Sequence, residues 1–135
     1  MIHIDSSFAI DLLREQRRRR PGPASAWVDA HGDTPLGASV FVWCELELGA
    51  TAAADPDLER QRVRDYLHTV TIVYPDERFA PAYGSLVERL QQRGTLPGTI
   101  DVLIATAALV DKVPIVTANV KHFDAVPGLR VLSYR

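Results

Sequence analysis

The sequence has little cysteine, little lysine and no long apolar run. Cys44 is the single cysteine among 135 residues, so no internal disulfide can form, and a reducing compartment is the simplest setting. No stretch approaches the roughly 20 apolar residues that a membrane-spanning helix needs. The first residues also lack the basic start and apolar core of a signal peptide. We therefore expect a cytoplasmic protein.

An excess of positive charge is missing as well. The chain has 15 Lys and Arg against 17 Asp and Glu, which gives a net charge of -2. This excludes a protein that holds nucleic acid through its overall charge, so any such contact must come from a local patch. With 47% hydrophobic residues the chain can build a full core, and its length fits one domain, residues 1–135.

Short β-branched segments alternate with helical segments along the whole chain, without repeats or a dividing linker. This alternation is typical of right-handed connections between parallel strands. It predicts an α/β fold, a three-layer α/β/α sandwich with a mostly parallel central sheet. The expected strands are residues 2–4, 35–38, 70–74, 113–117 and 129–132, and the expected helices are residues 8–16, 24–31, 40–53, 57–68, 79–93 and 100–109.

The helix of residues 100–109 is apolar nearly all round, yet it contains Asp101. Thr99 is a suitable N-cap, which places Asp101 in the first turn, where negative charge is favoured. An acid that only decorates a helix start is one interpretation. The other is a functional carboxylate on an otherwise buried element.

Two more acidic positions stand out. Asp5 follows the first strand, just before Ser6 and Ser7, either of which can cap the next helix. A turn-forming role is possible for Asp5, but ligands of open α/β sheets bind at the carboxyl ends of the strands. Glu45 and Glu47 interrupt the apolar helix of residues 40–53 and cannot share one face of it, so we expect one to face solvent.

The strand of residues 113–117 ends in Thr117-Ala118-Asn119, at the same edge of the sheet as Asp5. Carboxylates within about 4 Å of each other repel by about 4 kcal/mol per pair at an effective dielectric constant near 20, so a cluster needs a cation. Oxygen ligands, without clustered cysteine or paired histidine, indicate Mg²⁺ or Mn²⁺. Such ions bind phosphates and activate water, which points to phosphodiester hydrolysis.

Other conspicuous residues have simpler interpretations. The run Arg17 to Arg20 closes a helix, where it is either a solvated face or a phosphate-binding patch. Cys44 is expected to be buried and inert, because free cysteine packs as a small apolar residue. We expect His3 in the core or at its edge and Trp27 facing inward, as core residues usually are.

The order of these segments resembles the successive motifs of PIN-domain ribonucleases, and among them the VapC toxins of bacterial type II toxin–antitoxin pairs. The resemblance spans essentially the whole chain. It rests on Asp5 after the first strand, Glu45-Leu46-Glu47-Leu48-Gly49, the helix from Asp101 to Ala107, and the segment from Thr117 to Phe123.

The resemblance implies that Asp5, Glu45 and Asp101 are the acids of the site, with Asp5 and Asp101 as direct Mg²⁺ ligands. Glu45 fits the Glu-Leu-x-x-Gly motif of the family better than Glu47 does. Thr117 would support the site by hydrogen bonding, and Asn119 would occupy a fourth catalytic position.

The sequence departs from the family at two positions. Asn119 stands where many members have a fourth acid, and His122 replaces an acid often found before the phenylalanine. Asparagine can bind a metal or water through its oxygen but adds no charge, which favours one metal ion over two. Asp124 could compensate, although loop acids usually face solvent.

The resemblance further implies an Mg²⁺-dependent endoribonuclease acting on structured RNA such as tRNA or rRNA. It implies a homodimer, silenced by an antitoxin whose C-terminal segment fills the acidic groove. Two rivals are a PIN-like binding module with a weakened centre, suggested by Asn119, and an aspartyl phosphotransferase. The second is disfavoured because Ser7 stands where an Asp-x-Asp motif requires an acid.

Overall fold

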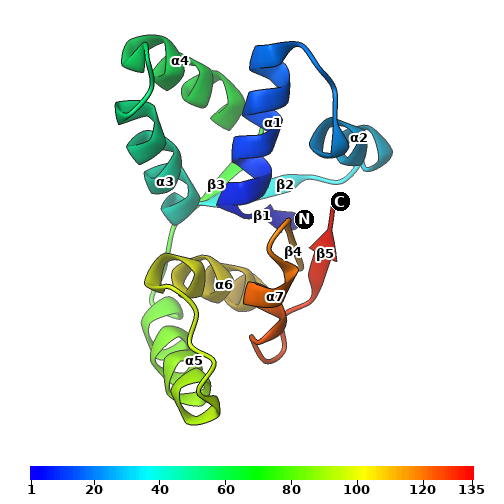
Figure 1. Cartoon of the computed structure of the whole chain (residues 1–135). Coiled ribbons are helices and arrows are strands. Elements are labelled where there is room, and N and C mark those ends of the chain that lie inside the picture. The colour runs from blue at the N-terminus through cyan, green and yellow to red at the C-terminus, as the bar shows by residue number, and fades with distance from the viewer.

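The computed structural model describes residues 1–135, and five parallel strands in the order β3-β2-β1-β4-β5 form its centre (Figure 1). Every neighbouring pair of strands is parallel, so the expectation of a mostly parallel sheet is confirmed. The strands are β1 (Ile2–Ile4), β2 (Leu36–Ser39), β3 (Thr71–Val73), β4 (Ile115–Thr117) and β5 (Val131–Ser133).

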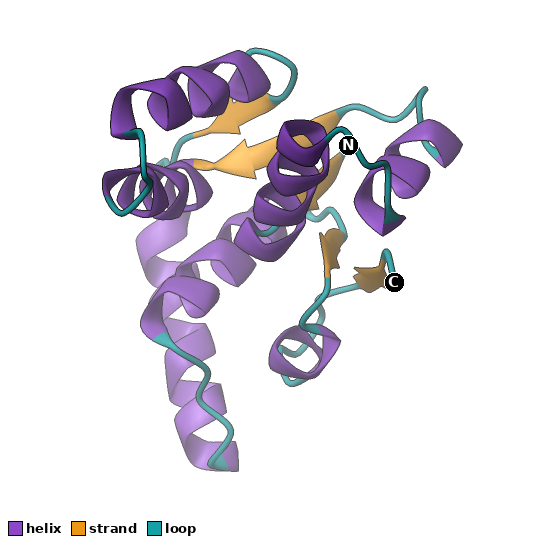
Figure 2. Cartoon of the chain, turned by 45° about the horizontal axis from the view of Figure 1, so that its top comes forward, coloured by secondary structure: helices purple, strands orange, loops and turns teal.

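Helices cover both faces of the sheet, which confirms the three-layer arrangement (Figures 1 and 2). One face carries α1 (Ser6–Arg18), α2 (Pro23–Ala30), α3 (Val40–Thr51) and α4 (Pro56–Leu67). The other carries α5 (Phe79–Arg93), α6 (Thr99–Asp111) and α7 (Val120–Asp124). The chain first adds β2 and β3 on one side of β1, and it then returns to add β4 on the other side. Right-handed crossovers therefore put the later helices on the opposite face, and the strand order reverses between β1 and β4.

The core lies on both faces of the two central strands. Ile4 of β1 and Ile115 and Val116 of β4 are fully buried, as expected for a parallel sheet covered by helices on both sides. Phe8 of α1 is also fully buried, and its ring meets Trp27 and Tyr134 edge to face, with centroids 5.5 Å and 5.0 Å away. The inward position expected for Trp27 is confirmed.

The starts of two helices differ from expectation. Asp5, not Ser6 or Ser7, is the N-cap of α1, and its carboxylate accepts a hydrogen bond from the Phe8 amide at 2.9 Å. Both serine hydroxyls are engaged elsewhere, so the carboxylate takes the cap and the helix begins two residues earlier than expected. Gly98, not Thr99, is the N-cap of α6, which still leaves Asp101 in the first turn.

Two further expectations concern side-chain burial. His3 is buried, with Nε2 2.9 Å from Oδ2 of Asp111 at the end of α6, so its core position is confirmed. The expectation of a buried Cys44 is wrong, because the thiol is exposed on α3. This helix is apolar on its outer side as well, where Leu48 is 71% exposed. No helix is long and apolar enough to cross a membrane.

Candidate functional site

The carboxylate of Asp5 lies at the carboxyl end of β1 and is only 3% exposed. Its Oδ1 accepts from the Phe8 amide at 2.9 Å and from the Ser7 hydroxyl at 2.8 Å, and its Oδ2 accepts from the Thr117 hydroxyl at 2.5 Å. These donors belong to α1 and to the end of β4, so the reversal in strand order brings them together. All of them are neutral, so the buried carboxylate has no cationic partner in the protein.

The two hydroxyls beside Asp5 are held as donors by the backbone. The Asn119 amide donates to Thr117 Oγ1 at 2.8 Å, and the Ala118 amide donates to Ser7 Oγ at 3.1 Å. Because each oxygen already accepts a hydrogen bond, its own proton is free to point at Asp5. The turn after β4 thus presets the hydrogen bonds that hold this carboxylate.

Burial raises the pKa of Asp5 above its ordinary value, and it outweighs the hydrogen bonds from Thr117, Phe8 and Ser7 that act in the opposite direction. The negative charge of Asp101 raises the pKa of Asp5 further, which shows that the two acids are electrostatically coupled. A nearby divalent cation would relieve both the desolvation and the repulsion.

Glu45 reaches the same edge from α3. Its Oε1 accepts from the hydroxyl of Ser6, the residue next to Asp5, at 2.9 Å. Glu47 instead accepts from the indole N–H of Trp43 at 3.0 Å on its own helix. The two glutamates therefore have different environments, and neither simply faces solvent, because each is held by a side-chain donor.

Asp101 enters from the first turn of α6 and is paired with His122 of α7, whose Nδ1 lies 3.2 Å from Asp101 Oδ2. The side chain of Asp101 is 26% exposed and that of His122 is 59% exposed, so this pair lies on the solvent-exposed side of the site. No lysine or arginine pairs with Asp101, which leaves its other oxygen available.

The site residues that we expected from β4 and α7 lie in different environments. Thr117 is buried against Asp5, whereas Asn119 is exposed and engages the site through its backbone amide. Asp124 is exposed at the end of α7 and forms no hydrogen bond or ion pair with the site. The hydrogen bonds of Ser6 and Ser7 are the part that sequence reasoning missed, because both residues were assigned to capping. The signal was an Asp-Ser-Ser run at the end of a strand.

The donor chemistry of the site fits a hard divalent cation. Asp5, Glu45 and Asp101 offer carboxylate oxygens, the ligands that Mg²⁺ and Mn²⁺ prefer, and no cysteine is among them. No three His, Cys, Asp or Glu side chains of the structure lie close enough together to hold a metal ion. Mg²⁺ commonly binds through one or two carboxylates and keeps several waters, so a site here would need fewer than three protein ligands.

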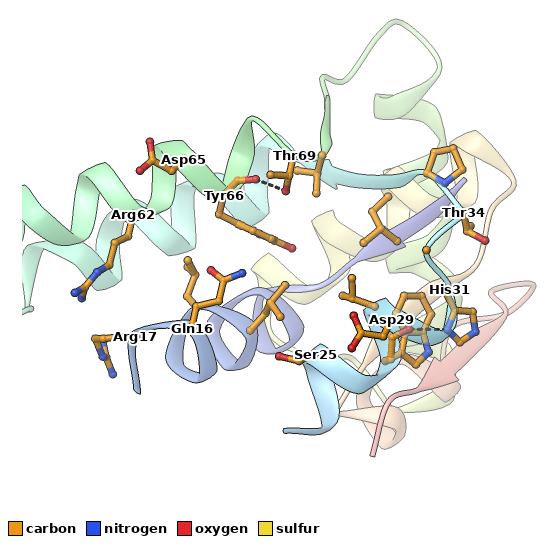
Figure 3. A pocket seen from close by; sticks show the side chains of 18 of the residues that line it. Gln16, Arg17, Ser25, Asp29, His31, Thr34, Arg62, Asp65, Tyr66 and Thr69 are labelled. Carbon is orange, nitrogen blue, oxygen red and sulfur yellow. Dashed lines mark hydrogen bonds between the residues drawn. The ribbon is translucent and has the colours of Figure 1, made fainter. Parts of the chain in front are cut away.

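A large cavity lies elsewhere in the molecule. It is a groove of about 940 Å³ between α1, α2 and α4, which we call the α1–α4 groove (Figure 3). Its floor includes Leu12, Leu13, Trp27 and Tyr66, and none of the site acids lines it. The groove opens beside the amino ends of β2 and β3, whereas the acids lie at the carboxyl ends of the strands. The groove and the acids therefore lie at opposite ends of α1.

The arginine run lies with the groove and not with the acids. Arg17 and Arg19 line one end of the α1–α4 groove, and Arg17 approaches Glu59 of α4 at 3.8 Å. Asp5 caps the other end of α1, which is about 20 Å away along 13 residues at 1.5 Å each. All four arginines are exposed, which fits both a solvated helix end and a phosphate-binding patch.

Comparison with known proteins gives a consistent family assignment. The PIN domain profile matches residues 2–129. The chain is similar to ribonuclease VapC1 of Methanocaldococcus jannaschii, with 34% identity over 96% of this chain and 85% of that protein. It is also similar to ribonuclease VapC2 of Haemophilus influenzae, with 29% identity over 97% of this chain and 96% of that protein.

Solved structures agree on the fold. A chain of the VapBC2 complex of Rickettsia felis, bound to a DNA fragment from its promoter, superposes with a TM-score of 0.90 at 21% identity, and the match covers both chains in full. A chain of VapBC-1 from nontypeable Haemophilus influenzae gives a TM-score of 0.85 at 23% identity, covering 99% of this chain and 98% of that one.

Replacing the buried acid gives a prediction about stability. In metal-free protein, Asp5→Asn should raise the melting temperature, because burial raises the pKa of Asp5 and so makes its charged form costly, while asparagine still caps α1. A carboxyl group with a raised folded-state pKa lowers stability as the pH rises through its titration. The gain should therefore be largest near pH 8 and vanish below about pH 4.

Thermal unfolding in EDTA across this pH range measures the effect. Asp57→Asn is the matched control, because the side chain of Asp57 is 97% exposed and the same charge change there should leave the melting temperature nearly constant. An Asp5→Asn variant that is less stable at every pH would contradict the prediction.

Proposed function

The chain belongs to the PIN-domain family, and from this premise we propose that it is an Mg²⁺-dependent endoribonuclease, the toxin of a toxin–antitoxin pair acting in the cytoplasm. The observation that carries the proposal is the buried Asp5 carboxylate, held by neutral donors and coupled to Asp101 at the carboxyl edge of the sheet. The relatives named ribonuclease VapC support the assignment of RNA as substrate.

In this proposal Asp5 and Asp101 hold the cation and Glu45 stands beside them. Bound Mg²⁺, or Mn²⁺ in its place, lowers the pKa of a water molecule and stabilises the charge that develops on the phosphate. Thr117 and Ser7 keep Asp5 oriented as an acceptor. Ser6 holds one oxygen of Glu45 and leaves the other free to accept a proton from water.

Asn119 takes the fourth catalytic position of the proposal. Its side chain is exposed at the rim of the site, so its amide can contact a water molecule or a phosphate oxygen. It adds no negative charge, and neighbouring His122 is paired with Asp101. Asn119 and His122 stand where many members of the family have acids, so this chain has fewer anionic ligands than a centre with two cations needs. This favours catalysis with one ion.

The substrate we propose is structured RNA, tRNA or rRNA, cleaved within the chain. Lys121 on α7 is exposed next to His122 and is placed to contact the phosphate backbone beside the scissile bond. The arginine run is about 20 Å from Asp5, at the far end of the 13-residue α1, so it is not part of the proposed cleavage centre.

The partner we propose is a cognate antitoxin, in keeping with the VapBC complexes among the similar structures. The α1–α4 groove suits a peptide segment with an apolar stripe, because Leu12, Leu13 and Tyr66 line it. Arg17 and Arg62 stand on either side of one end (Figure 3), so acidic side chains of the partner would be matched there.

A homodimer completes the proposal. The outer side of α3 carries an apolar stripe of Phe41, Cys44 and Leu48, which are spaced by three and four residues. Phe41 also contacts Phe79 of α5, with ring centroids 5.5 Å apart. This apolar stripe continues to Tyr83, which stacks on Phe79. A second copy of the chain, packed about a two-fold axis, would cover the stripe with an identical surface.

Cleavage of RNA tests the central proposal. Purified protein should cut tRNA or rRNA when Mg²⁺ or Mn²⁺ is added and should not cut it in EDTA. Asp101→Asn should lower the rate at least about 100-fold by removing a cation ligand. Asp57→Asn on exposed α4 is the matched control and should retain the full rate.

The same assay separates the rival functions. Cleavage that persists equally in Asp101→Asn would mean that the activity comes from another site or another protein. RNA binding without cleavage under every metal tried would favour the binding module with a weakened centre.

Charge reversal in the groove tests the antitoxin site. With a cognate antitoxin added, Arg62→Glu should weaken inhibition of RNA cleavage about tenfold or more while leaving cleavage itself unchanged, since Arg62 lines the groove and the acids do not. Arg64→Glu on the same helix is the control, because Arg64 does not line the groove. Equal inhibition of both variants would remove the groove from the antitoxin site.

A single substitution on α3 tests the homodimer. Leu48→Arg should convert a dimer into a monomer at micromolar concentration, because a charge would be buried in the apolar stripe. Leu58→Arg, at a leucine that is 47% exposed on α4, should leave the dimer intact. Sedimentation velocity measures both variants, and a wild-type protein that sediments as a monomer would contradict the proposal.

A further inference from the structure

The segment that follows β5 returns to α1 and packs against its first turns (Figure 1). Tyr134 is 7% exposed, and its ring lies edge to face on Phe8, the residue whose amide donates to Asp5. Neither Tyr134 nor Arg135 belongs to the family motifs in the sequence. Their contacts nevertheless reach the elements that carry the acids.

The hydroxyl of Tyr134 contacts two acceptors on α1. It donates its one proton to Oδ2 of Asp11 at 2.6 Å, and the backbone carbonyl of Ser7 lies 3.3 Å from the same hydroxyl oxygen. Asp11 is in turn paired with Arg135 at 2.5 Å and with Arg14 at 3.1 Å. We call the set of Ser7, Asp11, Tyr134 and Arg135 the α1 clasp.

Asp11 is a charged acceptor at the centre of the clasp. Burial opposes its charge, but the hydrogen bonds from Tyr134 and Arg135 outweigh that effect and hold the pKa of Asp11 below its ordinary value. The bond from Tyr134 is therefore charge-assisted, which makes it shorter and stronger than a bond between neutral groups.

The clasp shares Ser7 with the candidate site. The carbonyl of Ser7 lies 3.3 Å from the Tyr134 hydroxyl, and the hydroxyl of Ser7 donates to Asp5 at 2.8 Å. Ser133, the residue before Tyr134, pairs in register with Thr117, whose hydroxyl is the other donor to Asp5. The segment of residues 131–135 therefore meets the backbone of both residues whose hydroxyls hold the buried carboxylate.

We propose that Tyr134 and Asp11 are positioning residues, which fix the first turn of α1 so that Ser7 and Phe8 present their donors to Asp5. They touch no substrate and act only through Ser7 and the backbone of α1. The inference that this positioning serves catalysis rests on the proposed function. The inference that it orders the hydrogen bonds of Asp5 is independent of that function.

The variant Tyr134→Phe isolates the hydroxyl, because the ring that packs on Phe8 is kept. In metal-free protein the Phe8 amide should exchange with solvent several-fold faster, since the turn that carries it loses an anchor. The affinity for Mn²⁺ alone, measured by calorimetry, should fall about tenfold, as is common when a residue supporting a metal ligand is lost. RNA cleavage should lose a similar factor in kcat with KM nearly unchanged.

Tyr74→Phe is the control. Tyr74 is 61% exposed after β3 and its hydroxyl does not contact α1, so the same change there removes no bond to α1. It should leave amide exchange at Phe8, Mn²⁺ affinity and kcat as in the wild type. Asp11→Asn keeps an oxygen acceptor for Tyr134 and should restore part of what an Asp11→Ala variant loses.

The outcomes separate positioning from mere packing. Should Tyr134→Phe lower only the melting temperature, with Phe8 exchange and Mn²⁺ affinity like those of Tyr74→Phe, the clasp is a structural contact and the proposal is wrong. Should the wild type fail to cut RNA, the proposed function fails, whereas Phe8 exchange and Mn²⁺ affinity still decide whether the clasp orders Asp5.

Discussion

A carboxylate without a counter-charge, buried among hydroxyls, is the constraint on which the rest of this structure depends. Asp5 is 3% exposed and accepts only from neutral donors, so its charge is costly in the protein alone. The cost is tolerated because the same side chain caps α1 and because β4 delivers Thr117 to it. Strand order, helix start and site chemistry therefore meet in one group, and burial raises the pKa of Asp5 above its ordinary value.

Much of the fold followed from the sequence because periodicity and burial act locally. The bounds of α5 were predicted to the residue, and the placement of Asp101 in the first turn of α6 followed from Pro97-Gly98 and the apolar run behind it. The start of α1 was placed wrongly, because three adjacent residues can all cap a helix. Only the positions of Glu45 and Thr117, distant in sequence, decide which of the three does so.

The site itself was predictable as a set of acids but not as a network. Helical periodicity does not tell Glu45 and Glu47 apart, and only the family motif favours Glu45. The structure distinguishes them by partners 39 residues upstream, at Ser6, and on the same helix, at Trp43. Cys44 was misplaced for a related reason, since an apolar residue on an apolar helix is expected in the core. The outer side of α3 is apolar for another purpose, which in the proposed homodimer is contact with a second copy.

One helix connects two surfaces that the proposed function keeps apart. The amino end of α1 holds Asp5, and its carboxyl end brings Arg17 and Arg19 to the α1–α4 groove. A partner seated in the groove therefore touches the same rigid element that positions the acids, at about 20 Å from them. Inhibition through the groove needs either a segment long enough to run along α1 to the acids or a shift of α1 itself. The hydrogen bond from Tyr134 to Asp11 opposes such a shift, so under the proposed function we expect direct occlusion of the acids.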